Sequence, residues 1–180
     1  MTNTQNITLT GFMGTGKSTI GELLARRLGR QFVDMDALIE QREGRPIPQI
    51  FTDSGEPHFR QLEADLCREL AGQQNLVIAT GGGALIPAEN LRVMAAGGPV
   101  VCLDCEPQEL WRRIGQSEDR PMLADNDADR FSRLQALLAQ RSPAYARIEY
   151  HLDVTHLSPL EAVEQLVKIT NTVASIKKSR

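Results

Sequence analysis

Short apolar runs alternate with segments of helical periodicity along the 180 residues of the chain. This alternation is typical of βαβ units, in which parallel strands form one sheet and helices cover both of its faces. The first run, Ile7–Thr10, is rich in β-branched residues, and apolar side chains then recur at Ile20, Leu23, Leu24 and Leu28, which is the spacing of one helix face. The pattern predicts an α/β fold with five strands, near residues 7–10, 31–34, 76–79, 99–103 and 150–154.

Residues that favour helix ends divide the segments between these strands. Gly29 and Gly72 each follow a helical pattern, and Ser54 is a favoured cap for the helix that we expect over about residues 55–71. The last helix begins with Ser-Pro-Leu-Glu at 158–161, a capping box with proline in the first helical position. Its expected buried face consists of Leu160, Val163, Leu166 and Val167.

Two segments interrupt the plain alternation of strands and helices. Residues 36–72 are long enough for at least two helices rather than one short crossover, and residues 116–126 are polar and lack periodicity. Long segments of the second kind often serve as lids or binding loops. Since no linker or internal repeat divides the chain, we expect residues 1–180 to form a single domain with an insertion at about 36–72 and a lid at about 116–126.

The turn after the first strand carries the most specific motif. Residues 11–19 read Gly-Phe-Met-Gly-Thr-Gly-Lys-Ser-Thr and match G-x-x-x-x-G-K-[ST], the phosphate-binding loop. Its glycines allow a tight turn that aims backbone N–H groups at phosphate oxygens, and the helix that follows adds its own N-terminal N–H groups. A strand before the motif and a helix after it disfavour a chance glycine-rich turn. The expected nucleotide contacts are Gly14, Thr15, Gly16, Lys17, Ser18 and Thr19, with Lys17 on the terminal phosphates and the Ser18 hydroxyl on Mg²⁺.

Two carboxylates, Asp34 and Asp36, close the second predicted strand. Residues i and i+2 of an extended segment project to the same side, so both would point into the crevice beyond the strand ends, where ligands bind in open α/β sheets. Asp34 can hold Mg²⁺ through water, and Asp36 can orient or deprotonate an acceptor hydroxyl. The alternative for Asp36 is that it only caps the next helix.

Gly81, Gly82 and Gly83 follow the third predicted strand directly. Three successive glycines cost backbone entropy, which is understandable where the backbone must approach a ligand closely, although a flexible loop is equally allowed. Thr80 stands before them, where many phosphate-loop proteins place an acidic residue that organises Mg²⁺. That role would therefore fall to Asp34.

Three arginines are candidates for binding anionic groups of a ligand. Arg60 lies near the start of the predicted 55–71 helix, Arg120 lies in the expected lid, and Arg141 lies near the end of a further helical pattern. Guanidinium groups bind carboxylate or phosphate in a bidentate manner. The alternative for each is an ordinary solvated surface residue.

Composition and charge narrow the class of protein. Hydrophobic residues make up 41% and charged residues 24% of the chain, which is ordinary for a globular protein. The formal net charge of −3 argues against broad binding to nucleic acid, and it requires that positive charge be concentrated in one cleft if the ligands are anions. No apolar run approaches the ~20 residues of a membrane span, and the N-terminus has no signal-peptide pattern. We therefore expect a cytoplasmic protein that binds neither nucleic acid nor membrane.

Two of the three cysteines form a C-x-x-C sequence, Cys102 to Cys105. An odd cysteine count does not indicate a disulfide framework, and a redox or zinc-binding role is the minor alternative. A closed zinc site would need two more ligands, and no second Cys/His pair has suitable spacing. Because Cys102 lies inside an apolar run, a buried small hydrophobic residue is the simpler interpretation.

Taken in order along the chain, these motifs resemble those of shikimate kinases, a family in the nucleoside-monophosphate-kinase-like group of phosphate-loop kinases. The loop motif alone is unspecific, whereas D-x-D, F-R, GGG and R-P-x-L in this order are far more specific, and the resemblance covers nearly the whole chain. The family's usual lid reads R-P-L-L, so Met122 is a departure that conserves side-chain volume. The matching elements are Asp34–Asp36, Phe59-Arg60, Gly81–Gly83, Arg120–Leu123 and Arg141-Ser142-Pro143.

The resemblance implies transfer of a phosphoryl group from ATP, with Mg²⁺, to the 3-hydroxyl of shikimate, which gives ADP and 3-phosphoshikimate for chorismate and aromatic amino-acid biosynthesis. It also implies a monomer whose sheet has the strand order 2-3-1-4-5. Arg60, supported by Glu63, and Arg141 would bind the shikimate carboxylate. The implied catalytic residues are Lys17, Asp36 and Arg120, the further substrate contacts Gly81, Gly82 and Gly83, and the further ATP contacts Arg113, Arg120 and Pro159, while Ser18 and Asp34 would hold the metal.

Two other functions remain open at this stage. The same scaffold serves other small-molecule kinases, such as gluconate or nucleotide kinases, which a panel of acceptors would distinguish. A nucleotide-dependent switch without any acceptor is the more distant alternative. It would leave the set of Asp36, Arg60 and Arg141 unexplained, and ATP turnover independent of shikimate would favour it.

Overall fold

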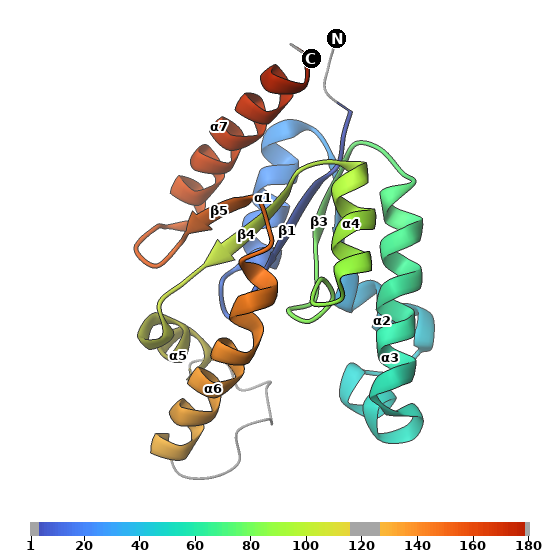
Figure 1. Ribbon diagram of the computed structural model, residues 1–180, viewed down its shortest axis with the longest axis vertical. Helices are drawn as coiled ribbons and strands as arrows, with labels where there is room; N and C mark the ends of the chain where they lie inside the picture. The colour runs from blue at the N-terminus through green and yellow to red at the C-terminus, as the bar shows by residue number, and fades with distance from the viewer. Residues whose placement is uncertain (1–3, 116–126, 179–180) are drawn as a thin grey trace.

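Five parallel strands form a single sheet in the order β2-β3-β1-β4-β5, as expected (Figure 1). The computed structural model describes residues 4–115 and 127–178. Each strand lies within one residue of its predicted position. The strands are β1 (Ile7–Gly11), β2 (Gln31–Asp34), β3 (Leu76–Ala79), β4 (Val100–Asp104) and β5 (Tyr150–Asp153).

Helices cover both faces of the sheet, which confirms the predicted fold class. On one face α1 and α7 lie side by side, and α3, α4 and α6 lie on the other (Figure 1). No helix in residues 4–115 and 127–178 combines the length and apolar character needed to cross a bilayer. The helices are α1 (Lys17–Leu28), α2 (Met35–Glu43), α3 (Ile47–Ala71), α4 (Ala88–Gly97), α5 (Pro107–Gly115), α6 (Asp127–Tyr145) and α7 (Pro159–Lys178).

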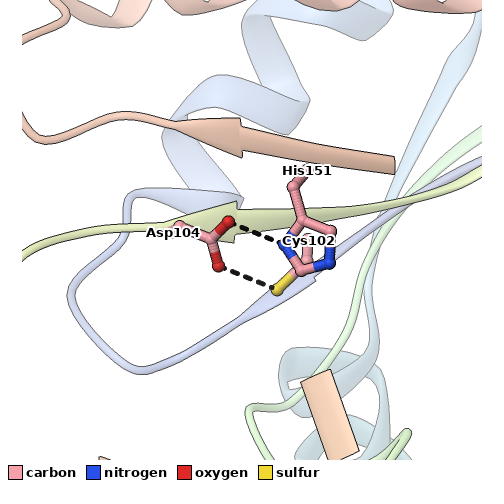
Figure 2. A group of neighbouring side chains, drawn as sticks. All are labelled: Cys102, Asp104 and His151. Carbon is pink, nitrogen blue, oxygen red and sulfur yellow. Dashed lines mark hydrogen bonds and ion pairs between the residues drawn. The ribbon is translucent and has the colours of Figure 1, made fainter. Parts of the chain in front are cut away.

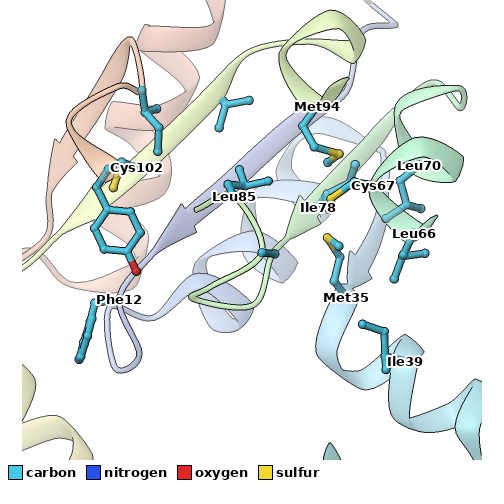
Figure 3. Packing of buried hydrophobic residues seen from close by; sticks show 14 of the residues in the cluster. Phe12, Met35, Ile39, Leu66, Cys67, Leu70, Ile78, Leu85, Met94 and Cys102 are labelled. Carbon is cyan, nitrogen blue, oxygen red and sulfur yellow. The ribbon is translucent and has the colours of Figure 1, made fainter. Parts of the chain in front are cut away.

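The two faces of the sheet bury two separate hydrophobic clusters. On β3, Leu76 and Ile78 face one cluster and Val77 faces the other, because successive side chains of a strand point to opposite sides. Both sets are fully buried, which explains why β3 reads as a continuous apolar run rather than an alternating one. The larger cluster joins the sheet to α2, α3 and α4 through Met35, Leu66, Leu70, Ile78 and Met94 (Figure 3).

The strand order places two loops next to each other at one edge of the sheet. β1 lies between β3 and β4. The connection that follows β1 runs toward the β2 edge of the sheet, whereas the connection that follows β3 runs the opposite way, to β4. The carboxyl ends of β1 and β3 are therefore adjacent, and the turns after Gly11 and after Thr80 meet there. In open α/β sheets this switch point is where ligands bind.

Helix ends follow the predicted punctuation. Gly29 adopts φ 64°, the left-handed conformation that ends α1. At the start of α7, Ser158 N donates to Glu161 Oε2 at 2.9 Å and Glu161 N donates to Ser158 Oγ at 3.3 Å, which confirms the capping box. Gly55, at φ 82° and ψ 164°, breaks α3, so the helix expected over 55–71 is its second part.

The prediction of a buried side chain is wrong for one residue of α7. Leu160 is 67% exposed, whereas Val163 and Leu166 of the same stripe are buried. The first turn of α7 lies along a groove that it shares with α1, lined by Leu23 and Arg27, and this groove is open to solvent. The helical spacing identified the correct face but not the point along the helix at which α1 stops covering it.

Candidate active site

The phosphate-binding loop joins β1 to α1 through three glycines in the left-handed region. Gly11, Gly14 and Gly16 have φ values of 132°, 84° and 89°, which residues with a side chain rarely adopt. A Cβ added to Gly14 would lie 2.9 Å from Ile114 Cγ1, so packing against α5 also requires glycine there. The Thr15 hydroxyl is buried and donates to the carbonyl of Phe12 at 2.9 Å, which holds the loop closed on itself.

Positive charge gathers on the inner side of this loop. Lys17 Nζ donates to the carbonyl oxygens of Gly11 and Phe12 at 3.0 and 2.9 Å, so the ammonium group lies over the turn. The N-cap of α1 is Gly16, which offers no side-chain acceptor, and the first turn contains no acidic residue. The partial positive charge of the helix N-terminus is therefore available to an anion.

Asp34 and Asp36 have different structural roles. Asp34 is the N-cap of α2: its Oδ1 accepts from the backbone N–H groups of Asp36 and Ala37 at 3.1 and 3.2 Å. The structure thus makes Asp34 the cap rather than Asp36. The expectation that both lie in an extended segment is wrong, because α2 begins at Met35 and Asp36 lies in its first turn.

The three successive glycines lie at the centre of the candidate site. A Cβ added to Gly81 would lie 2.5 Å from Asp36 Oδ1, one on Gly82 would lie 3.0 Å from Arg141 Nη1, and one on Gly83 would lie 2.7 Å from Arg60 Nη1. The Gly82 position is also 3.4 Å from the carbonyl oxygen of Gly11 in the phosphate loop. The turn after β3 therefore brings together Asp36, Arg60, Arg141 and the phosphate loop, which come from four distant parts of the chain.

Arg60 is held by two glutamates of its own helix. Its Nη1 donates to Glu63 Oε2 at 2.6 Å, and its Nη2 donates to Glu56 Oε1 at 2.8 Å. Burial lowers the pKa of Arg60, but the hydrogen bonds and charges of these glutamates outweigh burial and raise it. Burial raises the pKa of Glu63, which is 2% exposed, although Arg60 opposes that shift. Arg60 is therefore cationic and fixed in direction by a buried partner.

Arg141 and the glycine turn are positioned from α6. The Arg141 guanidinium lies 5.4 Å from the ring centroid of Phe12, a cation–π contact with the phosphate loop. Four residues later on the same helix, the Tyr145 hydroxyl donates to the carbonyl of Gly82 at 2.7 Å. Sequence reasoning gave no role to Phe12 or Tyr145, because neither contact follows from local spacing.

The remaining predicted nucleotide contacts lie apart from the glycine turn. Arg113 donates to Glu109 at 2.7 Å and to the carbonyl oxygens of Val154 and Thr155, just before α7. Pro159 is the exposed first residue of α7. The two residues thus lie on neighbouring segments, with Arg113 already bound to protein groups, while Arg120 and the expected lid at 116–126 lie outside the described residues.

The two side chains that were expected to bind magnesium, those of Ser18 and Asp34, lie next to each other. Ser18 Oγ donates to Asp34 Oδ2 at 2.5 Å, which joins the first turn of α1 to the end of β2. A hydroxyl and a carboxylate are hard oxygen ligands of the kind that Mg²⁺ prefers. The donor set therefore fits this metal ion.

Comparison of this sequence with known proteins identifies one family. The family model for shikimate kinase matches residues 13–171. The shikimate kinase of Geobacter metallireducens is 43% identical over 162 residues, which cover 90% of this chain and 89% of the relative. That of Pelotomaculum thermopropionicum is 41% identical over 163 residues, covering 91% of this chain and 94% of the relative.

Solved structures agree with this match. The shikimate kinase of Bacteroides thetaiotaomicron superposes with a TM-score of 0.85 at 33% identity, covering 92% of this chain and 97% of the other. That of Acinetobacter baumannii, in complex with shikimate, gives a TM-score of 0.83 at 36% identity, covering 97% and 95%. A gluconokinase from Sinorhizobium meliloti shares only the fold, with a TM-score of 0.59 at 19% identity. With its family match and these close relatives, the chain belongs to the shikimate kinase family.

Proposed function

We propose that this chain transfers the terminal phosphoryl group of ATP to the 3-hydroxyl of shikimate, giving ADP and 3-phosphoshikimate for chorismate and aromatic amino-acid biosynthesis. The observation that carries the assignment of residues is the turn Gly81–Gly83. One carboxylate and two guanidinium groups abut its successive residues, next to the phosphate loop. A small hydroxylated acid needs this combination: cations for its carboxylate and an anion for its hydroxyls.

The reaction requires positioning and charge stabilisation more than covalent chemistry. Charge spreads over the transferred phosphoryl group, and Lys17 and the N-terminus of α1 lie where they can stabilise it. Asp36 accepts a hydrogen bond from the acceptor hydroxyl and aligns it with the phosphorus atom. Arg60 and Arg141 hold the carboxylate of the acceptor, while Asp36 holds its hydroxyl, so the acceptor molecule is oriented at both ends.

Mg²⁺ would be held by Ser18 and Asp34, and when bound it neutralises charge on the phosphates. The hydrogen bond between these two side chains keeps both oxygens on the same side of the phosphate loop. Arg120 is proposed as the arginine that reaches the phosphates from the lid, and Arg113 and Pro159 as neighbours of the adenine. Arg120→Ala is then expected to lower kcat by about 10³-fold or more while ADP binding is kept.

We further propose that residues 1–180 form one domain and act as a monomer in the cytoplasm, with the insertion at about 36–72 carrying substrate contacts and a lid at about 116–126. Cys67, Cys102 and Cys105 carry free thiols, which suits a reducing compartment. Light scattering after size exclusion, with and without ATP and shikimate, tests the monomer. A mass of twice the 19.9 kDa chain would overturn it.

The direct test of the function is phosphoryl transfer from ATP to a panel of acceptors. Shikimate, gluconate, quinate and nucleoside monophosphates should be compared at equal concentration, with ADP release and the phosphorylated product both measured. We expect 3-phosphoshikimate with shikimate and background turnover with the others. Turnover of gluconate or of a nucleotide at the rate of shikimate, or ADP release that does not depend on an acceptor, would contradict the proposal.

A further inference from the structure

Three side chains with metal-binding atoms converge on the β4–β5 side of the sheet, outside the residues assigned to phosphoryl transfer (Figure 2). Cys102 and Asp104 lie two residues apart on β4 and so face the same side, and His151 is the register partner of Cys102 on β5. Cys102 Sγ lies 3.6 Å from Asp104 Oδ1, and His151 Nδ1 lies 2.7 Å from Asp104 Oδ2. One ligand atom from each residue lies within 4.8 Å of the other two.

The orientation of the histidine ring leaves one nitrogen for a cation. His151 Nε2 lies 3.1 Å from the carbonyl oxygen of Ile148, which can only accept, so the tautomer with its hydrogen on Nε2 satisfies this contact. The other nitrogen, Nδ1, faces a carboxylate, which also accepts. In the tautomer with its hydrogen on Nε2, the lone pair of Nδ1 points toward Asp104 and can bind a cation placed beside that carboxylate. A backbone carbonyl that receives the second N–H is the usual support of a metal-binding histidine.

A buried hydroxyl next to the sulfur is also without a partner. Thr10 is the register partner of Cys102 on β1 and faces the same side of the sheet. Thr10 is completely buried, and its Oγ1 has no hydrogen-bond partner among the described residues. A buried unsatisfied hydroxyl is costly and needs an explanation. A thiolate or a metal-bound water at this position would accept its hydrogen.

Two members of the cluster, Asp104 and His151, face a cavity, whereas Cys102 packs within the larger hydrophobic cluster. Asp104 and His151 line a cavity of about 260 Å³, together with Leu138, Ser142 and Tyr145 of α6. The side chain of Asp104 is 44% exposed and that of His151 is 36% exposed, whereas Cys102 is completely buried. An ion can therefore reach Asp104 and His151 from the cavity, and Cys102 Sγ lies behind them, 3.6 Å from Asp104 Oδ1. Water from the cavity can complete its coordination.

We propose that Cys102, Asp104 and His151 bind a zinc ion, with water as the fourth ligand. One thiolate, one imidazole and one carboxylate are ligands typical of Zn²⁺, and the sulfur disfavours Mg²⁺ and Ca²⁺. In a tetrahedral zinc site neighbouring ligand atoms lie about 3.4–3.6 Å apart. Cys102 Sγ is already at about this separation from Asp104 Oδ1, at 3.6 Å, whereas His151 Nδ1 and Asp104 Oδ2 are 2.7 Å apart and must separate when zinc binds. On binding, the Cys102 S–H bond breaks, the sulfur donates its electron pair to zinc, and the proton leaves to solvent.

This site differs from the one that the C-x-x-C sequence suggests. Cys105 lines the same cavity but is not a member of the cluster, because the chain leaves β4 after Asp104. The third ligand comes instead from β5, 47 residues after Asp104. The β4–β5 register, and not the spacing of the two cysteines, therefore creates the site.

Cobalt titration of the full-length protein tests the proposal. Co²⁺ bound to a thiolate gives a near-ultraviolet charge-transfer absorption, which Co²⁺ on oxygen ligands, such as those of Ser18 and Asp34, does not give. After treatment with a chelator and a thiol reductant, we expect this absorption to saturate at one Co²⁺ per chain and to be abolished by one equivalent of Zn²⁺. The absence of the absorption would overturn the site.

Matched variants identify the ligands. His151→Ala and Cys102→Ala are expected to weaken Co²⁺ and Zn²⁺ binding by about tenfold or more, and Cys102→Ala to remove the charge-transfer absorption. His156→Ala and Cys105→Ala are the controls and should bind as the unchanged protein does, since His156 is exposed and lies outside the cluster. Because His151 is partly exposed, its variant reports on binding even if Cys102→Ala fails to fold. Equal binding by His151→Ala and the unchanged protein would overturn the proposal.

Discussion

At the scale of single residues, two aspartates separated by one residue receive different surroundings. Asp34 accepts from the first turn of α2 and from the Ser18 hydroxyl, so three hydrogen bonds fix its carboxylate. Asp36 is the second residue of α2 and faces Gly81. A fixed carboxylate suits a metal ligand, whereas one that faces a turn without side chains can reach a small acceptor. The division of roles follows from the start of α2 at Met35.

Replacement of Asp36 by asparagine tests its role in catalysis. The amide keeps the size of the side chain but cannot accept a proton, so Asp36→Asn should lower kcat by about 10²–10⁴-fold, the usual contribution of a general base. Binding of ADP should stay within about twofold, because the phosphate loop is untouched. Asp65→Asn, on the exposed side of α3, serves as the control. Steady-state kinetics with varied shikimate give the answer, and a kcat like that of the control would remove Asp36 from the mechanism.

A methyl group at Gly81 should be as damaging as the loss of a functional side chain. Its Cβ would lie 2.5 Å from Asp36 Oδ1 and 3.1 Å from Glu63 Oε1, so both carboxylates must move. Gly81→Ala should therefore lower kcat/KM for shikimate by about tenfold or more, since small displacements of a catalytic group are costly. Gly72→Ala is the matched control, because its Cβ would make only ordinary contacts, the nearest 3.5 Å from the carbonyl oxygen of Glu69. Similar kcat/KM values for the two variants would contradict this role of the glycine turn.

At the scale of helices and strands, local pattern determines most of the architecture, while the site depends on pairing between distant segments. The bounds of β2 and β3 were predicted without error, and of these two strands β3 is a fully buried, continuous apolar run. The start of α2 was missed because Asp34 and Asp36 are equally good caps by sequence. Leu160 was misplaced because coverage by α1 is a tertiary property. The position of Tyr145 beneath Gly82 needed the packing of α6, which no spacing contains.

The acid stability of α5 is expected to depend on one carboxylate. Hydrogen bonds from Arg112 and then Arg113 lower the pKa of Glu109 from 4.5 to about 2. A lowered pKa means that the ion pairs stabilise the fold above the ordinary pKa and that this stabilisation is lost as the pH falls from 4.5 toward about 2. Glu109→Gln should therefore lower the melting temperature at pH 7, and this difference should shrink as the pH falls.

Thermal unfolding of both proteins between pH 7 and pH 3 measures this difference. We expect no more than a few degrees at pH 7, because surface ion pairs contribute little. Glu22→Gln, which removes a single exposed pair with Arg26 on α1, is the comparison. A difference between Glu109→Gln and the unchanged protein that is the same at every pH would show that the carboxylate charge is not responsible.

At the scale of the whole molecule, the fold gathers positive charge at one site although the net charge of the chain is negative. The formal net charge is −3, and ATP and shikimate are both anions, so the average field repels them. Lys17, Arg60 and Arg141 gather around the glycine turn and the phosphate loop, where the strand order brings their segments together. Elsewhere on the surface, cations pair with acidic residues, as Arg42 does with Glu69. Recognition of the substrates is therefore a short-range effect of a few cations.

This separation of local and overall charge predicts how salt affects the enzyme. Raising the ionic strength from about 0.01 to about 0.1 M shortens the screening length from about 30 to about 10 Å, which weakens the attraction between guanidinium and carboxylate at the partly exposed Arg60. The KM for shikimate should therefore rise with potassium chloride at saturating ATP, while kcat changes little. Arg60→Ala should start from a KM raised by about tenfold or more and rise less steeply, because one of the screened charges is already gone. Arg92→Ala removes an exposed cation on α4 that has no role in the candidate site. Its KM for shikimate should rise with salt as steeply as that of the unchanged protein. Parallel slopes for all three proteins would mean that Arg60 does not bind the carboxylate, even if its replacement lowers activity.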